Sequence, residues 1–198
     1  MNITSAKFIK GVVEPDEILE DGIPQIAFIG RSNVGKSSVI NTLTNKKDLA
    51  KTSSFPGRTQ QINVFLISAK GGNFTGGNTF YLVDLPGYGF AKGSKEDQAK
   101  IQSLIFWYLL DSQYQQKKVV LIIDAELGPT NNDMQMLHSL TEANKDVVIV
   151  ANKIDKIKKS SYIKQLKEIQ NAIGNYKIIP YSAEKKIGVN ELANEILK

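Results

Sequence analysis

The sequence contains no cysteine, one histidine and only two arginines among its 198 residues. A chain without cysteine forms no disulfide and has no thiolate metal ligand, a composition that fits the reducing cytoplasm. No apolar run approaches the ~18 residues of a membrane-spanning helix, and the N-terminus lacks the apolar segment of a signal peptide. We therefore expect a cytoplasmic protein with no membrane span.

The overall composition is that of an ordinary globular protein, with 41% hydrophobic and 23% charged residues. A chain of 198 residues is long enough to bury one full core, and no repeat or linker divides it. We predict a single domain over residues 1–198 with a short N-terminal strand as an extension. The net charge of +5 is compatible with an RNA-rich partner, although many proteins that bind no RNA share it.

One stretch near the N-terminus has the pattern of a phosphate-binding loop. The apolar run 26–29 is followed by the octet GRSNVGKS and then by a helical pattern, which matches GxxxxGK[ST] between a strand and a helix. Gly30 and Gly35 allow backbone conformations in which successive N–H groups face phosphate oxygens, and the helix adds its positive N-terminal end. We expect Lys36 to reach the β- and γ-phosphates and the Ser37 hydroxyl to bind Mg²⁺.

The two arginines lie in loop motifs that are expected to contact phosphate. Arg31 belongs to the octet, and Arg58 belongs to a later loop without helical or strand periodicity. The planar guanidinium group suits phosphate geometry better than a lysine ammonium does. Both positions therefore suggest phosphate contacts, with coincidence as the alternative.

The remaining chain alternates between apolar runs and helical patterns. Continuous apolar runs indicate strands that are covered on both faces and hence a mainly parallel sheet. Residues 62–67 and 79–83 are joined by too short a connection for a crossover helix, so this pair is expected to be antiparallel. We predict an α/β fold with a mainly parallel central sheet, one antiparallel strand and helices on both faces. The predicted strands are 6–13, 26–29, 62–67, 79–83, 119–123, 147–151 and 178–181, and the predicted helices are 37–43, 95–113, 132–143, 162–173 and 189–197.

The predicted helix 95–113 is apolar most of the way round for two turns. Phe106, Trp107 and Leu110 lie off the stripe that would face the sheet. Two interpretations stay open for them: burial beneath the N-terminal strand or a neighbouring helix, and a docking face for a partner.

Polar signatures follow four of the apolar strands directly, at Gly30, Asp84, Asn152 and Ser182. In an open parallel sheet the carboxyl ends of the strands share one edge, where ligands bind. We therefore expect these four signatures to form one pocket.

Each signature suggests a part of a nucleotide site. In Asp84-Leu85-Pro86-Gly87, the Asp84 carboxylate suits Mg²⁺ bound through water, and the Gly87 N–H suits a γ-phosphate. The Asp155 carboxylate matches the two donors on the Watson–Crick edge of guanine, which adenine does not offer, and losing such a partner can cost a discrimination factor of about 10⁴ or more. The Lys153 stem can lie along the base, and the Ala183 N–H can reach its carbonyl oxygen.

The ordered set GRSNVGKS, Thr59, DLPG, NKID and SA resembles the five guanine-nucleotide motifs of the translation-factor-class P-loop GTPases. More narrowly, GRSNVGKSS, FPGRTQQINVF and LVDLPGYGFAK resemble the EngB (also YsxC or YihA) family of bacterial ribosome-assembly GTPases, over nearly the whole chain. The resemblance implies a Ras-like fold, binding of GTP or GDP with Mg²⁺, and work on maturation of the large ribosomal subunit. That family more often has Thr-Lys-x-Asp at this position. The NKID of this chain instead follows the general GTPase pattern.

The motifs and the resemblance together give a set of expected site residues. The expected nucleotide contacts are Gly30, Arg31, Ser32, Asn33, Val34, Gly35, Lys36, Ser37, Ser38, Gly57, Arg58, Thr59, Asp84, Leu85, Pro86, Gly87, Asn152, Lys153, Asp155, Ser182 and Ala183. The expected Mg²⁺ ligands are Ser37, Thr59 and Asp84, and the expected catalytic residues are Lys36, Thr59 and Gly87.

The expected mechanism lacks a glutamine side chain that would orient the attacking water. Thr59 would close over Mg²⁺ only when a γ-phosphate is present, and loss of that phosphate would free residues 46–61 and the loop after Gly87. Ras-type enzymes orient the attacking water with a glutamine after DxxG, but here Tyr88 follows Gly87. We expect slow intrinsic hydrolysis, near ~10⁻⁴ s⁻¹ or below a few per minute, accelerated by a partner. Two substitutes stay open: K⁺ bound with the help of Asn33, and Arg58 acting within the chain.

Some conspicuous residues have a simple structural interpretation. His138 is expected at a surface or boundary position of its helix. The lysines between residues 153 and 167 are either a solvated surface or a face that contacts rRNA.

Two other functions compete with a monomeric GTPase switch that acts on ribosomes. An ATP-dependent P-loop kinase is disfavoured by Asp155 and by the lack of an arginine-bearing lid insertion. A nucleotide-gated binding module, in which hydrolysis is incidental, stays open.

Overall fold

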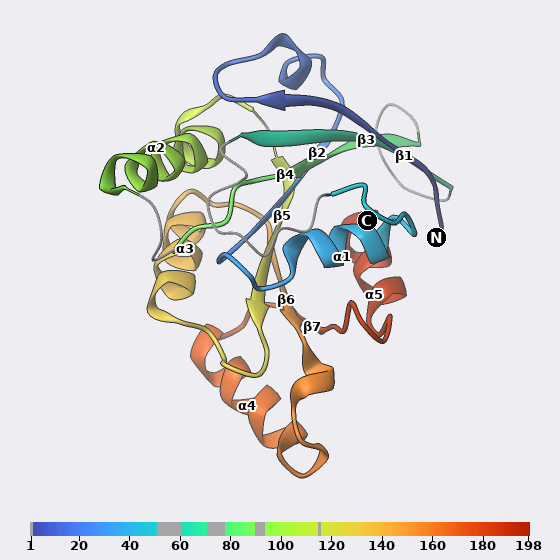
Figure 1. Ribbon diagram of the computed structural model, residues 1–198, viewed down its shortest axis with the longest axis vertical. Helices are drawn as coiled ribbons and strands as arrows, with labels where there is room; N and C mark the ends of the chain where they lie inside the picture. The colour runs from blue at the N-terminus through green and yellow to red at the C-terminus, as the bar shows by residue number, and fades with distance from the viewer. Residues whose placement is uncertain (1, 51–60, 71–77, 90–93, 115) are drawn as a thin grey trace.

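The computed structural model describes residues 2–50, 61–70, 78–89, 94–114 and 116–198. These residues form a seven-stranded sheet in the order β1-β3-β4-β2-β5-β6-β7 (Figure 1). Strand β3 is antiparallel to both of its neighbours, β1 and β4, and the pairs from β4 to β7 are parallel. The strands are β1 Asn2–Val12, β2 Gln25–Gly30, β3 Ile62–Lys70, β4 Thr79–Asp84, β5 Gln116–Asp124, β6 Val147–Asn152 and β7 Ile178–Pro180.

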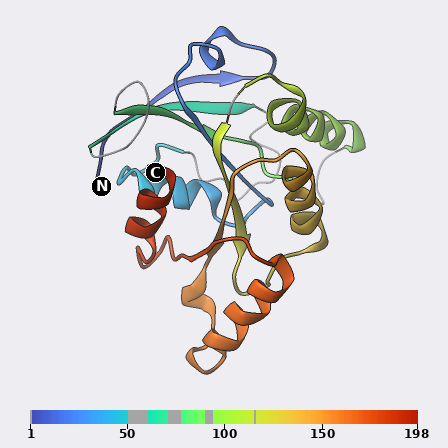
Figure 2. The same ribbon diagram turned by 180° about the vertical axis from the view of Figure 1, so that it is seen from behind.

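Helices cover both faces of this sheet. Helices α2, α3 and α4 lie on one face, and α1 and α5 lie on the other (Figures 1 and 2). Side chains of β2 alternate between the two cores, with Ala27 and Ile29 on the α2 side and Ile26 and Phe28 on the α1 side. The predicted α/β architecture, with one strand running against the others, is therefore confirmed. The helices are α1 Lys36–Leu43, α2 Lys95–Phe106, α3 Asn131–Glu142, α4 Tyr162–Ile173 and α5 Val189–Ile196.

Strand β1 begins at Asn2, four residues before the predicted strand. It pairs only with β3 at the edge of the sheet and buries Ala6 and Val12, while most of its other side chains are at least partly exposed. An edge strand with so few buried positions has a weak apolar pattern, which is why its first residues gave no signal. Within the described ranges, we find no helix that combines the length and apolarity needed to cross a bilayer.

Helix α2 ends at Phe106, and a π-helical turn, Trp107–Asp111, replaces its predicted last turns. The Ser112 N–H donates to the Trp107 carbonyl over 2.7 Å, and the Trp107 and Tyr114 rings meet edge to face at 5.6 Å. Phe106, Trp107 and Leu110 are partly buried against the core. Packing against the core accounts for the buried part of these three side chains, and a docking face for a partner on their exposed part stays a prediction.

The predicted loop before α4 is not wholly irregular, because it contains two short 3₁₀ turns, Ile154–Lys156 and Lys159–Ser161.

His138 is at the surface as predicted, with 73% of its side chain exposed and Nε2 3.3 Å from the Glu142 carboxylate.

A buried carboxylate on α5 ties the end of the chain to the sheet. Glu195 accepts hydrogen bonds from Lys177 at 2.6 Å, from Lys198 at 3.0 Å and from the buried Lys118 at 3.2 Å. The Lys177 hydrogen bond is the largest cause that lowers the pKa of Glu195, from its ordinary 4.5 to about 2.

We predict that Glu195→Gln lowers the free energy of unfolding at pH 7 by about 1–3 kcal/mol, because charge-assisted hydrogen bonds are lost. A lowered pKa stabilises the fold above the unfolded pKa, and this contribution is lost between about pH 4.5 and 2. Urea unfolding should therefore show a difference between variant and wild type that shrinks toward pH 2. Glu184→Gln, at an exposed carboxylate, is the control, and a difference that stays constant with pH would contradict the prediction.

Candidate functional site

The loop from Gly30 to Ser37 connects β2 to α1 and has the backbone of an anion-binding loop. Asn33 and Gly35 both have left-handed conformations, with φ of 67° and 91°. Alternation of left- and right-handed residues turns successive N–H groups toward one point. A Cβ at Gly35 would lie 2.4 Å from Asn152 Nδ2, so only glycine fits there. Helix α1 begins directly after Gly35, which directs its positive end at the loop.

Lys36 and Asp84 form an ion pair at the end of this loop. Their side chains are only 10% and 5% exposed. Strands β2 and β4 are parallel neighbours with Phe28 level with Asp84, so the two strands end side by side. The expected phosphate-binding ammonium group therefore lies against the expected metal-binding carboxylate. Ser37 and Ser38 follow Lys36 in the first turn of α1.

The loop after Asp84 packs directly on the phosphate loop. The Ser32 N–H donates to the Tyr88 carbonyl over 2.9 Å, and the Tyr88 N–H donates to the Gly30 carbonyl over 3.3 Å. A Cβ at Gly87 would lie 2.9 Å from Ser32 Oγ, so a larger residue would push the two loops apart. Leu85 and Pro86 are buried, and the Leu85 N–H donates to the Phe28 carbonyl.

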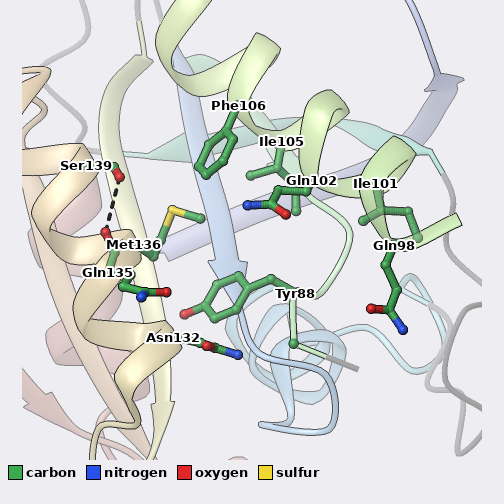
Figure 3. A pocket seen from close by; sticks show the side chains of 11 residues that line it. Tyr88, Gln98, Ile101, Gln102, Ile105, Phe106, Asn132, Gln135, Met136 and Ser139 are labelled. Carbon is green, nitrogen blue, oxygen red and sulfur yellow. Dashed lines mark hydrogen bonds between the residues drawn. The ribbon is translucent and has the colours of Figure 1, made fainter. Parts of the chain in front are cut away.

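The Tyr88 side chain is directed away from the phosphate loop and toward α3. Its ring lies beside a pocket of about 310 Å³ between α2 and α3 (Figure 3). Its hydroxyl donates to Asp133 Oδ1 over 2.7 Å, and the other carboxylate oxygen accepts from the Thr130 N–H and hydroxyl at 2.8 and 2.7 Å. Burial, and secondarily the Asp133 charge, raises the pKa of Tyr88 well above its usual range. The tyrosine therefore stays protonated with its hydroxyl occupied.

Asn152 joins the phosphate loop to the segment that follows β7. Its amide Nδ2 donates to the Val34 carbonyl over 2.9 Å, and its Oδ1 accepts from the Ala183 N–H at 3.2 Å. The residue is only 2% exposed. A single buried amide therefore holds two loops that are far apart in the sequence.

Lys153 and Asp155 extend this connection. Lys153 has a left-handed backbone with φ of 69°, and its ammonium group donates to the Asn33 carbonyl over 2.8 Å. Asp155 is exposed and accepts a hydrogen bond from the hydroxyl of buried Ser182. The NKID and SA motifs and the phosphate loop thus lie at one edge of the sheet, as expected from the strand ends.

Three expected site residues, Gly57, Arg58 and Thr59, lie outside the described residues, so their predicted roles stay predictions. Arg31 is partly buried at the phosphate loop, and its Nε has no hydrogen-bond partner among the described residues. Its side-chain carbons pack against Gly89, where a Cβ would lie 3.2 Å from Arg31 Cγ.

Sequence analysis missed two carboxylates that contact the site. Asp124 ends β5 and accepts from the Lys153 ammonium group over 2.7 Å. Its signal was the same as at the other strand ends, a polar residue directly after an apolar run. Asp133, the partner of Tyr88, had as its signal only the Thr-x-x-Asp capping box that starts α3.

Two families of GTP-binding proteins and several of their members are similar to this chain. Residues 25–153 match the family described as 50S ribosome-binding GTPase, and residues 111–198 match the elongation factor Tu GTP binding domain. The chain is 43% identical over 197 residues to the probable GTP-binding protein EngB of Clostridium perfringens (strain SM101 / Type A), covering 98% of this chain and 95% of the relative.

Two solved structures are also similar. A crystal structure of a probable GTP-binding protein engB has a TM-score of 0.67 at 26% identity and covers 87% of this chain and 98% of that one. A crystal structure of Era in complex with MgGDPNP and nucleotides 1506–1542 of 16S ribosomal RNA has a TM-score of 0.69 at 27% identity, covering 88% and 56%. From the family match and the near full-length identity, we conclude that the chain is a P-loop GTPase with a Ras-like fold and belongs to the EngB family of GTP-binding proteins.

Proposed function

We propose that this GTPase is a monomeric, single-domain switch that acts in the cytoplasm in assembly of the large ribosomal subunit. The observation that carries the proposal is the pair of hydrogen bonds in which Asn152 donates to the Val34 carbonyl and accepts from the Ala183 N–H, because they hold the phosphate loop and the segment after β7 at one edge of the sheet. The family description, 50S ribosome-binding GTPase, supports the ribosomal part, as does the Era complex with 16S rRNA.

The phosphate side would work by exchange of partners. Lys36 would leave Asp84 and donate to the β- and γ-phosphate oxygens, where it stabilises the charge of the transferring group. Asp84 would then hold Mg²⁺ through water, together with the hydroxyls of Ser37 and Thr59. These are the hard oxygen donors that Mg²⁺ prefers, and the bound ion would neutralise phosphate charge. The structure of the similar protein Era, which is in complex with MgGDPNP, supports a nucleotide that is bound together with Mg²⁺.

The base side would select guanine through Asp155. Its exposed carboxylate would accept from the N1–H and the 2-amino group, while the Lys153 stem lies along the ring and the Ala183 N–H donates to the base carbonyl. Adenine has no matching pair of donors, so it would leave Asp155 unsatisfied.

We predict that the protein binds GTP at least about 10⁴-fold more tightly than ATP, and that Asp155→Ala reduces this preference to within about tenfold. Titration with fluorescent GTP and ATP measures both constants. Glu142→Ala is the control, because Glu142 is an exposed carboxylate on α3 that contacts only His138 among the described ion pairs. Equal affinity of the wild type for ATP and GTP would contradict the proposed site.

The hydrolysis step would be slow because Tyr88 does not present a group that orients water. Its hydroxyl donates to Asp133, on the side of the loop that faces α3. Asn33 offers a substitute: it is exposed on the phosphate loop, and its amide oxygen suits a monovalent cation such as K⁺. A cation there would act on transition-state charge as an arginine finger does. Arg58 is the alternative.

We predict single-turnover GTP hydrolysis near ~10⁻⁴ s⁻¹ in NaCl and at least about tenfold faster in KCl, less than the gain from an arginine finger. Asn33→Ala should remove the difference between the salts. Asn45→Ala should retain it, because Asn45 is also exposed and left-handed, with φ of 50°, but lies after α1. Equal rates of the wild type in KCl and NaCl at matched ionic strength would exclude the role of K⁺.

A lysine patch before and on α4 is the proposed contact with rRNA. Lys156, Lys158 and Lys159 are exposed and make no ion pair with any described residue, and exposed Lys164 is 3.8 Å from Glu168. Unpaired lysines attract a phosphate backbone and release its counterions. The patch follows Asp155 directly, so it lies next to the proposed base site.

We predict that changing these four lysines to glutamine weakens co-sedimentation with large subunits and lowers its salt dependence, by about 0.7 in the log–log slope per lost phosphate contact. The control changes four exposed lysines elsewhere: Lys7, Lys70, Lys95 and Lys100. Unchanged association would make the patch a solvated surface. Equal association in the GTP, GDP and nucleotide-free states would contradict the switch.

A further inference from the structure

Asp124 is a buried carboxylate whose two oxygens face different partners. The residue is 6% exposed at the end of β5, where it is level with Asn152 of β6. Oδ1 accepts from the backbone N–H groups of Glu126 and Leu127 at 3.0 and 3.4 Å. Oδ2 accepts from the Lys153 ammonium group at 2.7 Å. One oxygen therefore holds its own loop, and the other holds a residue of the NKID motif.

Lys153 is constrained both at its backbone and at its ammonium group. Its backbone is left-handed, which costs a residue with a Cβ about 1 kcal/mol or more unless the surroundings enforce it. Its ammonium group bridges Asp124 and the carbonyl of Asn33 in the phosphate loop, the latter over 2.8 Å. Asp124 ends β5, and Asn33 lies in the loop that follows the neighbouring strand β2. Because the ammonium group is bound to both, the aliphatic stem of Lys153 has little freedom.

We propose that Asp124 is a positioning residue for guanine binding. It fixes the Lys153 ammonium group against the phosphate loop, so that the stem is already in place when the base arrives. The inference rests on the proposed function, in which guanine lies between Lys153 and Asp155. It adds a residue outside the nucleotide motifs whose effect on affinity is transmitted entirely through Lys153.

The chemistry of Asp124 allows this role to be separated from its local structural one. Asparagine at position 124 keeps a carbonyl oxygen that accepts from the Glu126 and Leu127 N–H groups. Its amide NH₂ then faces the Lys153 ammonium group, so donor meets donor and the ion pair is lost. Asp124→Asn therefore retains the turn after β5 and releases only Lys153.

The test is a double-mutant cycle on the affinity for GDP, with Asp124→Asn and Lys153→Met as the single variants. We expect Asp124→Asn to weaken GDP binding at least about tenfold, the scale of a lost charge-assisted hydrogen bond. In the Lys153→Met background the same change should weaken GDP binding no further, because the ammonium group that Asp124 positions is already absent. KM for GTP should rise in parallel, while the single-turnover rate at saturating GTP stays within about threefold.

A matched control separates positioning from general loss of stability. Glu195→Gln also removes a buried partner of a lysine, Lys118, but on α5 away from the nucleotide motifs. It should lower the melting temperature and leave GDP affinity unchanged. If Asp124→Asn does not fold, the double variant, which buries no unpaired charge, is compared with Lys153→Met instead.

The outcomes are distinct. Wild-type affinity for GDP in Asp124→Asn, or in the double variant, would overturn the inference. An equal loss in the presence and absence of the Lys153 ammonium group would also overturn it, since Asp124 would then act through the fold. A wild type that binds ADP as tightly as GDP would instead contradict the proposed function, whatever the variants do.

Discussion

The arrangement of the site depends on one buried amide, that of Asn152. Its donor and acceptor meet two backbone groups, the Val34 carbonyl and the Ala183 N–H, from segments almost 150 residues apart. A buried backbone group without a partner costs about 1–3 kcal/mol, so each of these bonds favours one relative position of the loops. That position also depends on the register of β6, whose last residue is Asn152 and which pairs with both β5 and β7. Threonine, the commoner residue of the resembled family there, likewise has a donor and an acceptor in one side chain.

The site contains two ion pairs, which differ in whether nucleotide binding would break them. Lys36 pairs with Asp84, and both have a further use, since an ammonium group suits phosphate and a carboxylate suits a hard cation. Binding of a metal–triphosphate would exchange this pair for two others and would leave no buried charge alone. Lys153 and Asp124 differ, because Asp124 has a second oxygen bound to its own loop. In the proposed site the first pair would exchange its partners, whereas the second would stay in place.

The sequence was informative wherever a motif is local in the chain. Two features predicted the edge of the sheet at which the site forms: the octet between its strand and helix, and the polar residues at the ends of β4 and β6 and after β7. They did so because continuous apolar runs indicate parallel strands, whose carboxyl ends share one edge. Asp124 carried the same pattern as the other strand ends, but its contact with Lys153 depends on the order of the strands, which apolar periodicity does not reveal. Asp133 was missed because its contact with Tyr88 depends on which helix packs beside the loop after Asp84. The π turn at Trp107 was missed because it preserves the apolar pattern of the helix.

Tyr88 connects the loop after Asp84 both to the phosphate loop and to α3. Its backbone is bonded to Gly30 and Ser32 on one side, while its hydroxyl is bonded to Asp133 on the other. Asp133 lies in the first turn of α3, where it also accepts hydrogen bonds from Thr130 in the capping box. Displacement of Gly87 must therefore either break the hydroxyl–carboxylate bond or carry the start of α3 with it. Such a bond is worth about 1.5–3 kcal/mol, which is comparable to the coupling energy between sites in allosteric proteins. Tyr88 thereby links the phosphate loop to the first turn of α3 through hydrogen bonds of its backbone and its hydroxyl.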